Sequence, residues 1–191
     1  MACRRLDWCV FLLLAVALLI LPLRWLIAVM LAAAVHELGH YAALRLCGED
    51  IRDFKIGLGG AQMTVGQMGR YQELFCALAG PISGLSLIFL ARWLPRTAVC
   101  ACIHSAYNLL PVYPLDGGRA VRCICASDRV CRFIEWGCLC LIATVGVYGS
   151  FVLQLGILPI AVSALTIHRA LAGKGLAMRH LFRYNRGRIN E

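Results

Sequence analysis

The segment VHELGHYAA, from Val35 to Ala43, holds two histidines and a glutamate at a spacing that suits metal chemistry. On a helix, His36 and His40 lie one turn apart on the same face, so both imidazoles can reach one metal ion. Glu37 lies beside that face, where its carboxylate can take a proton from water at the metal. Two imidazole ligands with an adjacent carboxylate base predict metal-assisted hydrolysis.

A catalytic zinc ion needs a third protein ligand and one open position. The best candidate is Asp116, which lies in the stretch NLLPVYPLDGGR from Asn108 to Arg119. Pro111 and Pro114 cannot continue a regular helix, so we expect the chain to break here, and Gly117–Gly118 would let it turn sharply beside the aspartate. Taken alone, this segment is equally compatible with an ordinary helix-ending loop that leaves Asp116 in water.

A purely structural role is the alternative to a metal site for these residues. His36, His40 and Glu37 could be two core histidines and a glutamate that reaches toward water, but an unpaired Glu at membrane depth costs several kcal/mol. Gly39 costs about 1 kcal/mol of helix propensity relative to Ala, and close approach of a neighbouring helix would explain it. We interpret His104 as a core residue rather than a fourth ligand.

Composition predicts a membrane protein. Hydrophobic residues make up 61% of the 191 residues and charged residues only 15%, whereas a soluble domain carries about 25% charged residues. The apolar residues also come in long blocks. We therefore expect an all-α membrane protein with about six transmembrane helices, namely Trp8–Leu23, Trp25–Leu46, Leu74–Leu94, Ala98–Tyr113, Phe133–Gln154 and Gly156–Leu171.

The distribution of basic residues supports this count. With both termini in the cytoplasm, sixteen of the 19 Lys and Arg residues fall on the inner side, and only Arg24, Arg92 and Arg96 fall outside. That asymmetry is the one that the positive-inside rule demands. The second and fourth spans then both run inward, so the histidines and Asp116 reach the same depth near the cytoplasmic face.

The segment between the second and third spans is rich in glycine and alternates partly between apolar and polar residues. It predicts a short re-entrant or hairpin element with a turn at Gly59–Gly60, although a plain connecting loop fits equally well. As a hairpin, Gly59 and Gly60 would help bind the substrate by adding a strand to its extended segment. We divide the chain into a transmembrane core, residues 1–171, and a basic cytoplasmic tail, residues 172–191, lying along the anionic inner leaflet.

Cysteines and net charge point to no further site. The 11 cysteines include three Cys-x-Cys pairs, which zinc frameworks rarely use, and we expect reduced, structural thiols. We interpret the net charge of +9 as basic residues that set the membrane topology and anchor the chain to headgroups of the lipid bilayer. Nucleic-acid binding is not expected, because no stripe of basic residues is interleaved with aromatic residues.

Three motifs together resemble one family. HELGH on an early span, Ala-Gly-Pro at Ala79–Pro81 and NLLPVYPLDGG on a later span are similar to the site-2 protease family of intramembrane zinc metalloproteases. The resemblance is strongest to the stage IV sporulation FB proteases of endospore-forming bacteria and covers most of the chain. Leu109 stands where many members have proline, as in the sporulation-type branch.

The resemblance implies one Zn²⁺ per chain, held by His36, His40 and Asp116, with Glu37 as the catalytic base. It also implies that Asn108 binds the substrate backbone or the oxyanion. The substrate would be a membrane-embedded or membrane-associated proprotein, with a sporulation sigma-factor precursor as the leading suggestion, and a separate membrane inhibitor or regulatory protein is a further expected partner. The location would be a bacterial cell membrane.

Two further functions use the same residues differently. A zinc-binding membrane scaffold without protease activity would keep the ligands but would not need Glu37 as a base. An ion or small-solute transporter would use Glu37 and Asp116 as sites at mid-membrane depth, but transporters often show paired broken helices in two halves. Only one broken span and no repeat are found, so the protease hypothesis is favoured.

Overall fold

The computed structural model describes residues 4–6, 15, 17–19, 21–49, 53–57, 60–66, 68–125, 127–154 and 156–171. The chain divides into two compact units, Met1–Leu109 and Leu110–Glu191, and each is described by itself. The predicted first span, Trp8–Leu23, lies mostly outside the described residues, and the predicted tail, 172–191, lies wholly outside them.

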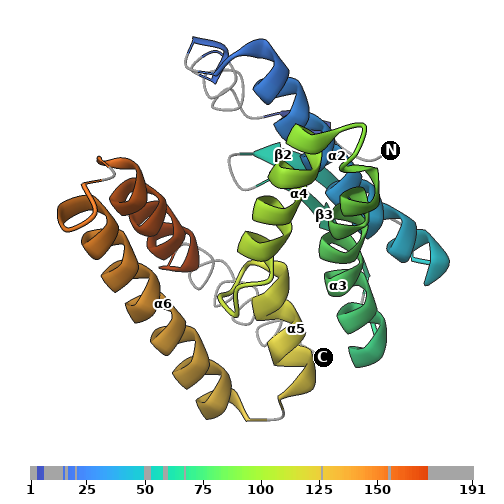
Figure 1. The fold of residues 1–191 in the computed structure, drawn as a ribbon. Helices are drawn as coiled ribbons and strands as arrows, with labels where there is room; N and C mark the ends of the chain where they lie inside the picture. Colours follow the sequence, from blue (N-terminus) through green and yellow to red (C-terminus); the bar gives the residue numbers. More distant parts are fainter. Residues whose placement is uncertain are drawn as a thin grey trace. The chain divides into compact units, whose positions relative to one another are not determined.

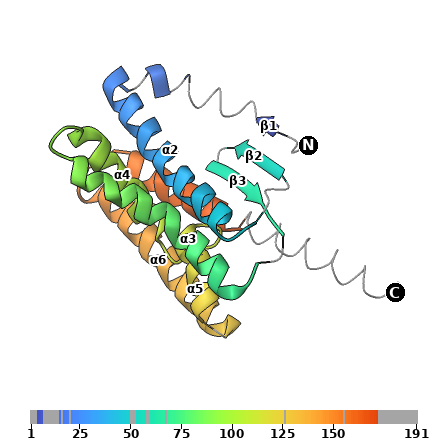
Figure 2. The same cartoon turned by 90° about the vertical axis from the view of Figure 1, so that its right-hand side faces the viewer.

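Three helices form the body of the first unit and pack side by side (Figures 1 and 2). They are α2 (Leu23–Leu46), α3 (Arg70–Ser86), which continues into the short 3-10 helix η1 (Leu87–Leu90), and α4 (Pro95–Asn108). Gly39 of α2 lies directly against α3, because a Cβ at this position would overlap Ser83 and the carbonyl of Ala79. The close helix approach predicted from Gly39 is therefore confirmed.

The first unit also contains a three-stranded sheet in the order β1-β2-β3. Strands β2 (Asp53–Gly57) and β3 (Gly60–Thr64) are antiparallel, with Gly57 opposite Gly60. They occupy the segment for which a hairpin was one prediction. Strand β1 (Arg4–Leu6) pairs in parallel with β2, and this pairing was not expected, since two segments some fifty residues apart carry no local signal of contact. The fold is thus mainly helical, with a small sheet added.

The second unit begins with α5 (Asp116–Ile124) and α6 (Asp128–Phe151), followed by the helix Leu158–Leu171. The last two helices pack closely, since the Ser163 hydroxyl donates to the Ile142 carbonyl at 2.9 Å and a Cβ at Gly146 would overlap Ser163. Small residues at such crossings let membrane helices approach one another.

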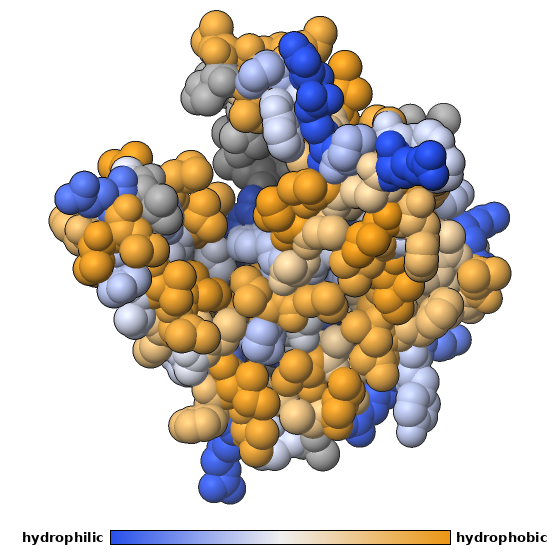
Figure 3. All heavy atoms as spheres, in the orientation of Figure 1, coloured by the Kyte–Doolittle hydropathy of each residue, from blue (hydrophilic) through white to orange (hydrophobic). Residues whose placement is uncertain are grey.

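The described helices have the character of an integral membrane protein. Three segments are long and apolar enough to cross a membrane, namely Leu23–Leu46, Arg70–Leu90 and Asp128–Phe151. Large apolar side chains point outward from them, such as Phe89 and Phe133, which are 85% and 81% exposed, and most of the face in Figure 3 is hydrophobic. These three segments overlap the second, third and fifth predicted spans, while the count of six spans stays a prediction.

The contact at Gly39 leads to a stability prediction. Replacing Gly39 with Ala adds about 1 kcal/mol of helix propensity, but the new methyl group meets the Ala79 backbone carbonyl, which cannot turn away. Overpacking costs about 1–3 kcal/mol, so the net loss is up to about 2 kcal/mol, and we expect thermal unfolding of the detergent-solubilised protein to occur up to about 8 °C lower.

Gly137 of α6 provides the matched control, because a Cβ there meets nothing within 4 Å. The Gly137→Ala protein should unfold at or slightly above the temperature of the unmodified protein. Equal unfolding temperatures for the Gly39→Ala and Gly137→Ala proteins would show that α2 and α3 do not approach each other at Gly39.

Candidate metal centre

Helix α2 places the two histidines of the HELGH motif on its inner side. Buried positions recur along this helix at Leu26, Ala28, Ala32, His36, Ala43 and Leu44. Ala28, Ala32 and His36 follow one another at four-residue spacing, and Ala43 lies two turns after His36, so these positions share one helical stripe. His36 is only 2% exposed, and its Nε2 atom lies 3.2 Å from Nε2 of His40. The two imidazoles therefore turn the same ring nitrogen toward each other.

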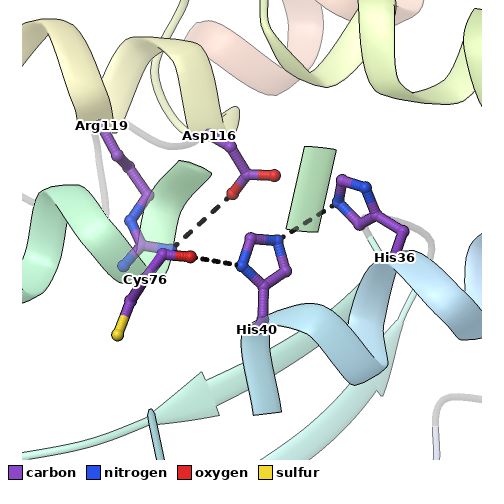
Figure 4. Close-up of polar contacts among 5 residues, drawn as sticks. All are labelled: His36, His40, Cys76, Asp116 and Arg119. Carbon is purple, nitrogen blue, oxygen red and sulfur yellow. Dashed lines mark hydrogen bonds and ion pairs between the residues drawn. The ribbon is translucent and has the colours of Figure 1, made fainter. Parts of the chain in front are cut away.

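A backbone carbonyl fixes the orientation of the His40 ring. Nδ1 of His40 lies 2.7 Å from the carbonyl oxygen of Cys76 on α3, as Figure 4 shows. Since a carbonyl oxygen only accepts, Nδ1 carries the hydrogen, and in the neutral ring Nε2 keeps its lone pair. This is the arrangement of a metal-binding histidine, whose second nitrogen donates to an outer acceptor.

The pair of nitrogens fits a metal ion. Tetrahedral zinc with bonds of about 2.0–2.1 Å separates two ligand nitrogens by about 3.3–3.4 Å, and the observed separation is 3.2 Å. A direct N–H···N hydrogen bond between the rings would give a similar distance, so measured metal binding distinguishes the two arrangements.

Gly80 of α3 lies against the face of the His40 ring. A Cβ at this position would overlap three ring atoms of His40, among them Nε2. Cys76 and Gly80 are one helical turn apart, so α3 offers His40 both a hydrogen-bond acceptor and the space that its ring occupies. The Ala79–Pro81 motif of the sequence thus has a structural role beside His40.

Helix α4 contributes two more polar residues to the first unit. The His104 ring packs edge-to-face on His36, with centroids 4.7 Å apart at 89°. One turn later, Asn108 ends α4, and its Nδ2 donates to the His104 carbonyl at 3.0 Å. That bond uses one of the two amide hydrogens, so Asn108 retains a second donor.

In the second unit, Asp116 occupies the first turn of α5 and is 8% exposed. Pro111 and Pro114 lie between the end of α4 at Asn108 and the start of α5. The helix break predicted from these two prolines is therefore confirmed. A negative charge is favourable at a helix N-terminus, and Arg119 lies 3.9 Å from the carboxylate.

The role predicted for Gly117 and Gly118 is wrong. Both residues lie inside α5 instead of forming a sharp turn. A Cβ at Gly118 would overlap the backbone of Val112 and Tyr113, so this glycine is needed because the loop before α5 folds directly against the helix.

An ion pair and a ring contact tie α5 to its neighbours in the second unit. The guanidinium of Arg122 lies 4.2 Å from the centroid of the Tyr113 ring and 3.6 Å from Oε2 of Glu135 on α6. Glu135 is 3% exposed, and a buried carboxylate requires such a partner. These contacts hold the helix that begins with Asp116.

Among the described residues, His36, His40 and Asp116 form a group that could hold a metal ion. Each offers one ligand atom, and Figure 4 shows the three side chains. His104 is not in this group, and its interpretation as a core residue stays a prediction.

The remaining predicted site residues lie on α2 and in the segment of the β2–β3 hairpin. Glu37 lies on α2 next to His36 and is partly exposed. Gly60 begins β3, whereas Gly59 lies outside the described residues. Cys76 and Gly80 were not predicted as supports of a histidine. The Ala-Gly-Pro motif includes Gly80 but says nothing about which residue Gly80 faces, and no motif of the sequence includes Cys76.

No protein-family model and no curated protein sequence matches the chain. A search of solved structures finds a site-2 protease from Methanocaldococcus jannaschii, with a TM-score of 0.62 and 20% sequence identity over 89% of each chain. The chain therefore has the fold of that site-2 protease.

Proposed function

We propose that the chain is an intramembrane metalloprotease of the site-2 type, hydrolysing peptide bonds in or near transmembrane segments of membrane-tethered proproteins. The observation that carries this proposal is the facing pair of Nε2 atoms, 3.2 Å apart, on His36 and His40. Asp116 completes a donor set of two imidazoles and one carboxylate, which suits a catalytic zinc site. The fold of a site-2 protease adds independent support.

His36, His40 and Asp116 would hold the ion, with one position left open for the reaction. When bound, zinc would activate water and polarise the scissile carbonyl. Glu37 would take a proton from the attacking water at a carboxylate oxygen and deliver it to the leaving amide nitrogen. The second amide hydrogen of Asn108 would donate to the oxygen of the scissile carbonyl as negative charge develops there.

The substrate must be extended to reach these groups, because a helix hides its carbonyls in internal hydrogen bonds. Strand β3 lies at one edge of the described sheet, so the hairpin that includes Gly59 and Gly60 could add an extended substrate as a further strand. A membrane-tethered transcription-factor precursor of sporulation is the proposed substrate. We place the site near the cytoplasmic face of a bacterial membrane, with both termini in the cytoplasm.

Zinc content tests the ligand set without any substrate. We expect the purified full-length protein to hold one zinc per chain by elemental analysis. Asp116→Ala and His36→Ala should each reduce this content to near zero at micromolar free zinc, because removing a ligand leaves too few to close the site. A chelator should remove the metal and abolish cleavage of co-expressed single-span membrane proteins, and added zinc should restore both.

His168, on the helix Leu158–Leu171, is exposed, and His168→Ala is therefore the matched control that should keep its zinc. Full zinc content in the Asp116→Ala protein would contradict the proposed ligand set. A metal-free protein that cleaves as well as the zinc-loaded one would contradict the proposed chemistry.

A further inference from the structure

Two cysteines from different helices lie side by side next to the metal centre. Sγ of Cys47, the C-cap of α2, is 4.0 Å from Sγ of Cys76 on α3. Neither belongs to a Cys-x-Cys pair, so the sequence did not single them out. They are 29 residues apart, and packing of α2 on α3 brings them together.

The two thiols differ in accessibility. Cys76 is 2% exposed and forms a small apolar cluster with Ala43 and Leu44. Cys47 packs at the margin of this cluster and is partly exposed. An accessible thiol beside a buried one is the usual arrangement of a reversible dithiol, in which the first reacts with an oxidant and the second resolves the product.

We propose that Cys47 and Cys76 form a modification site that takes low-molecular-weight disulfides and closes to a disulfide bond. The Cys47 sulfur attacks the small disulfide, whose S–S bond breaks, and a mixed disulfide forms as one small thiol leaves with a proton. The Cys76 sulfur then attacks the Cys47 sulfur, and a second small thiol leaves. The two protein thiols lose two electrons and two protons in total, and the small disulfide is reduced to two thiols.

Closure of this bond would reach the metal centre through one residue. The sulfurs must approach from 4.0 Å to about 2.05 Å, and the coupling requires that Cys76 takes part in this movement. The carbonyl of that same residue accepts the Nδ1 hydrogen of His40 at 2.7 Å. Because outer partners of a ligating histidine change metal affinity about 10–100-fold, the disulfide weakens metal binding by about tenfold or more. This coupling rests on the proposed function, whereas formation of the disulfide does not.

Peptide mapping tests the modification site. The full-length protein in detergent is treated with oxidised glutathione, the remaining thiols are alkylated, and the peptides are analysed by mass spectrometry without reduction. We expect a Cys47–Cys76 cross-link that dithiothreitol removes. Cys47→Ser should prevent it, whereas Cys140→Ser, at an exposed position of α6, should not. Absence of this cross-link when exposed cysteines are glutathionylated would overturn the proposal.

Zinc affinity, measured by competition with a chromophoric chelator, tests the coupling. Oxidation should weaken zinc binding at least about tenfold in the unmodified protein, dithiothreitol should restore it, and the Cys47→Ser protein should not respond. Equal affinities before and after a mapped cross-link would overturn the coupling. If the reduced protein binds no zinc, the proposed function and the coupling both fail. The peptide map then still shows whether the Cys47–Cys76 disulfide forms, because that test does not depend on zinc.

Discussion

Replacing Glu37 with Gln is expected to lower the rate of peptide cleavage by about 10²–10⁴-fold, the usual contribution of a general base. Gln has nearly the same shape as Glu but cannot take a proton from water. Since Glu37 is not one of the proposed ligands, zinc content should stay at one per chain. Bound zinc together with lost cleavage distinguishes a role in the reaction from a structural defect, which would lower both.

The rate is measured with a co-expressed membrane-tethered precursor, by following the amount of cleaved product and its new N-terminus. Glu49→Gln, at a partly exposed position just after α2, is the matched control and should cleave normally. If the Glu37→Gln protein holds zinc and cleaves at the unmodified rate, the protease mechanism is wrong. If the unmodified protein holds zinc but cleaves no precursor, the scaffold hypothesis gains support.

Replacing Gly80 with Ala is expected to weaken zinc binding by about 10–100-fold, as loss of an outer contact does in other metal sites. The new methyl group would overlap the His40 ring, which would swing away because it is the end of a flexible side chain. His40 would then lose the orientation that its bond to the Cys76 carbonyl provides. Cleavage at limiting zinc should fall in parallel.

Gly39→Ala separates this effect from a general loss of stability. At Gly39 the obstacle includes the backbone of Ala79, whereas at Gly80 it is a side chain. We therefore expect Gly80→Ala to lower zinc affinity more than the unfolding temperature, and Gly39→Ala to do the reverse. Normal zinc affinity in the Gly80→Ala protein, measured by chelator competition, would show that Gly80 does not position His40.

Much of the candidate site follows from local rules. The helical period places His36 and His40 on one face wherever the helix lies, and two prolines end a helix whatever surrounds them. Gly39 lowers the stability of an isolated helix, which predicted a compensating contact, and α3 supplies that contact. The turn predicted at Gly117–Gly118 is wrong because glycine can occupy a helix despite its cost of about 1 kcal/mol, and the packing of the preceding loop against Gly118 favours the helix here.

By itself, the sequence determined the membrane character of the chain, the register of the HELGH helix and the break before Asp116, since each depends on neighbours within a few residues. The tertiary structure alone decided that α3 brings Cys76 and Gly80 to His40, that β1 joins β2 and that Cys47 meets Cys76. These contacts join residues far apart in the chain, and hydrophobic periodicity specifies which face of a helix is buried but not which partner covers it.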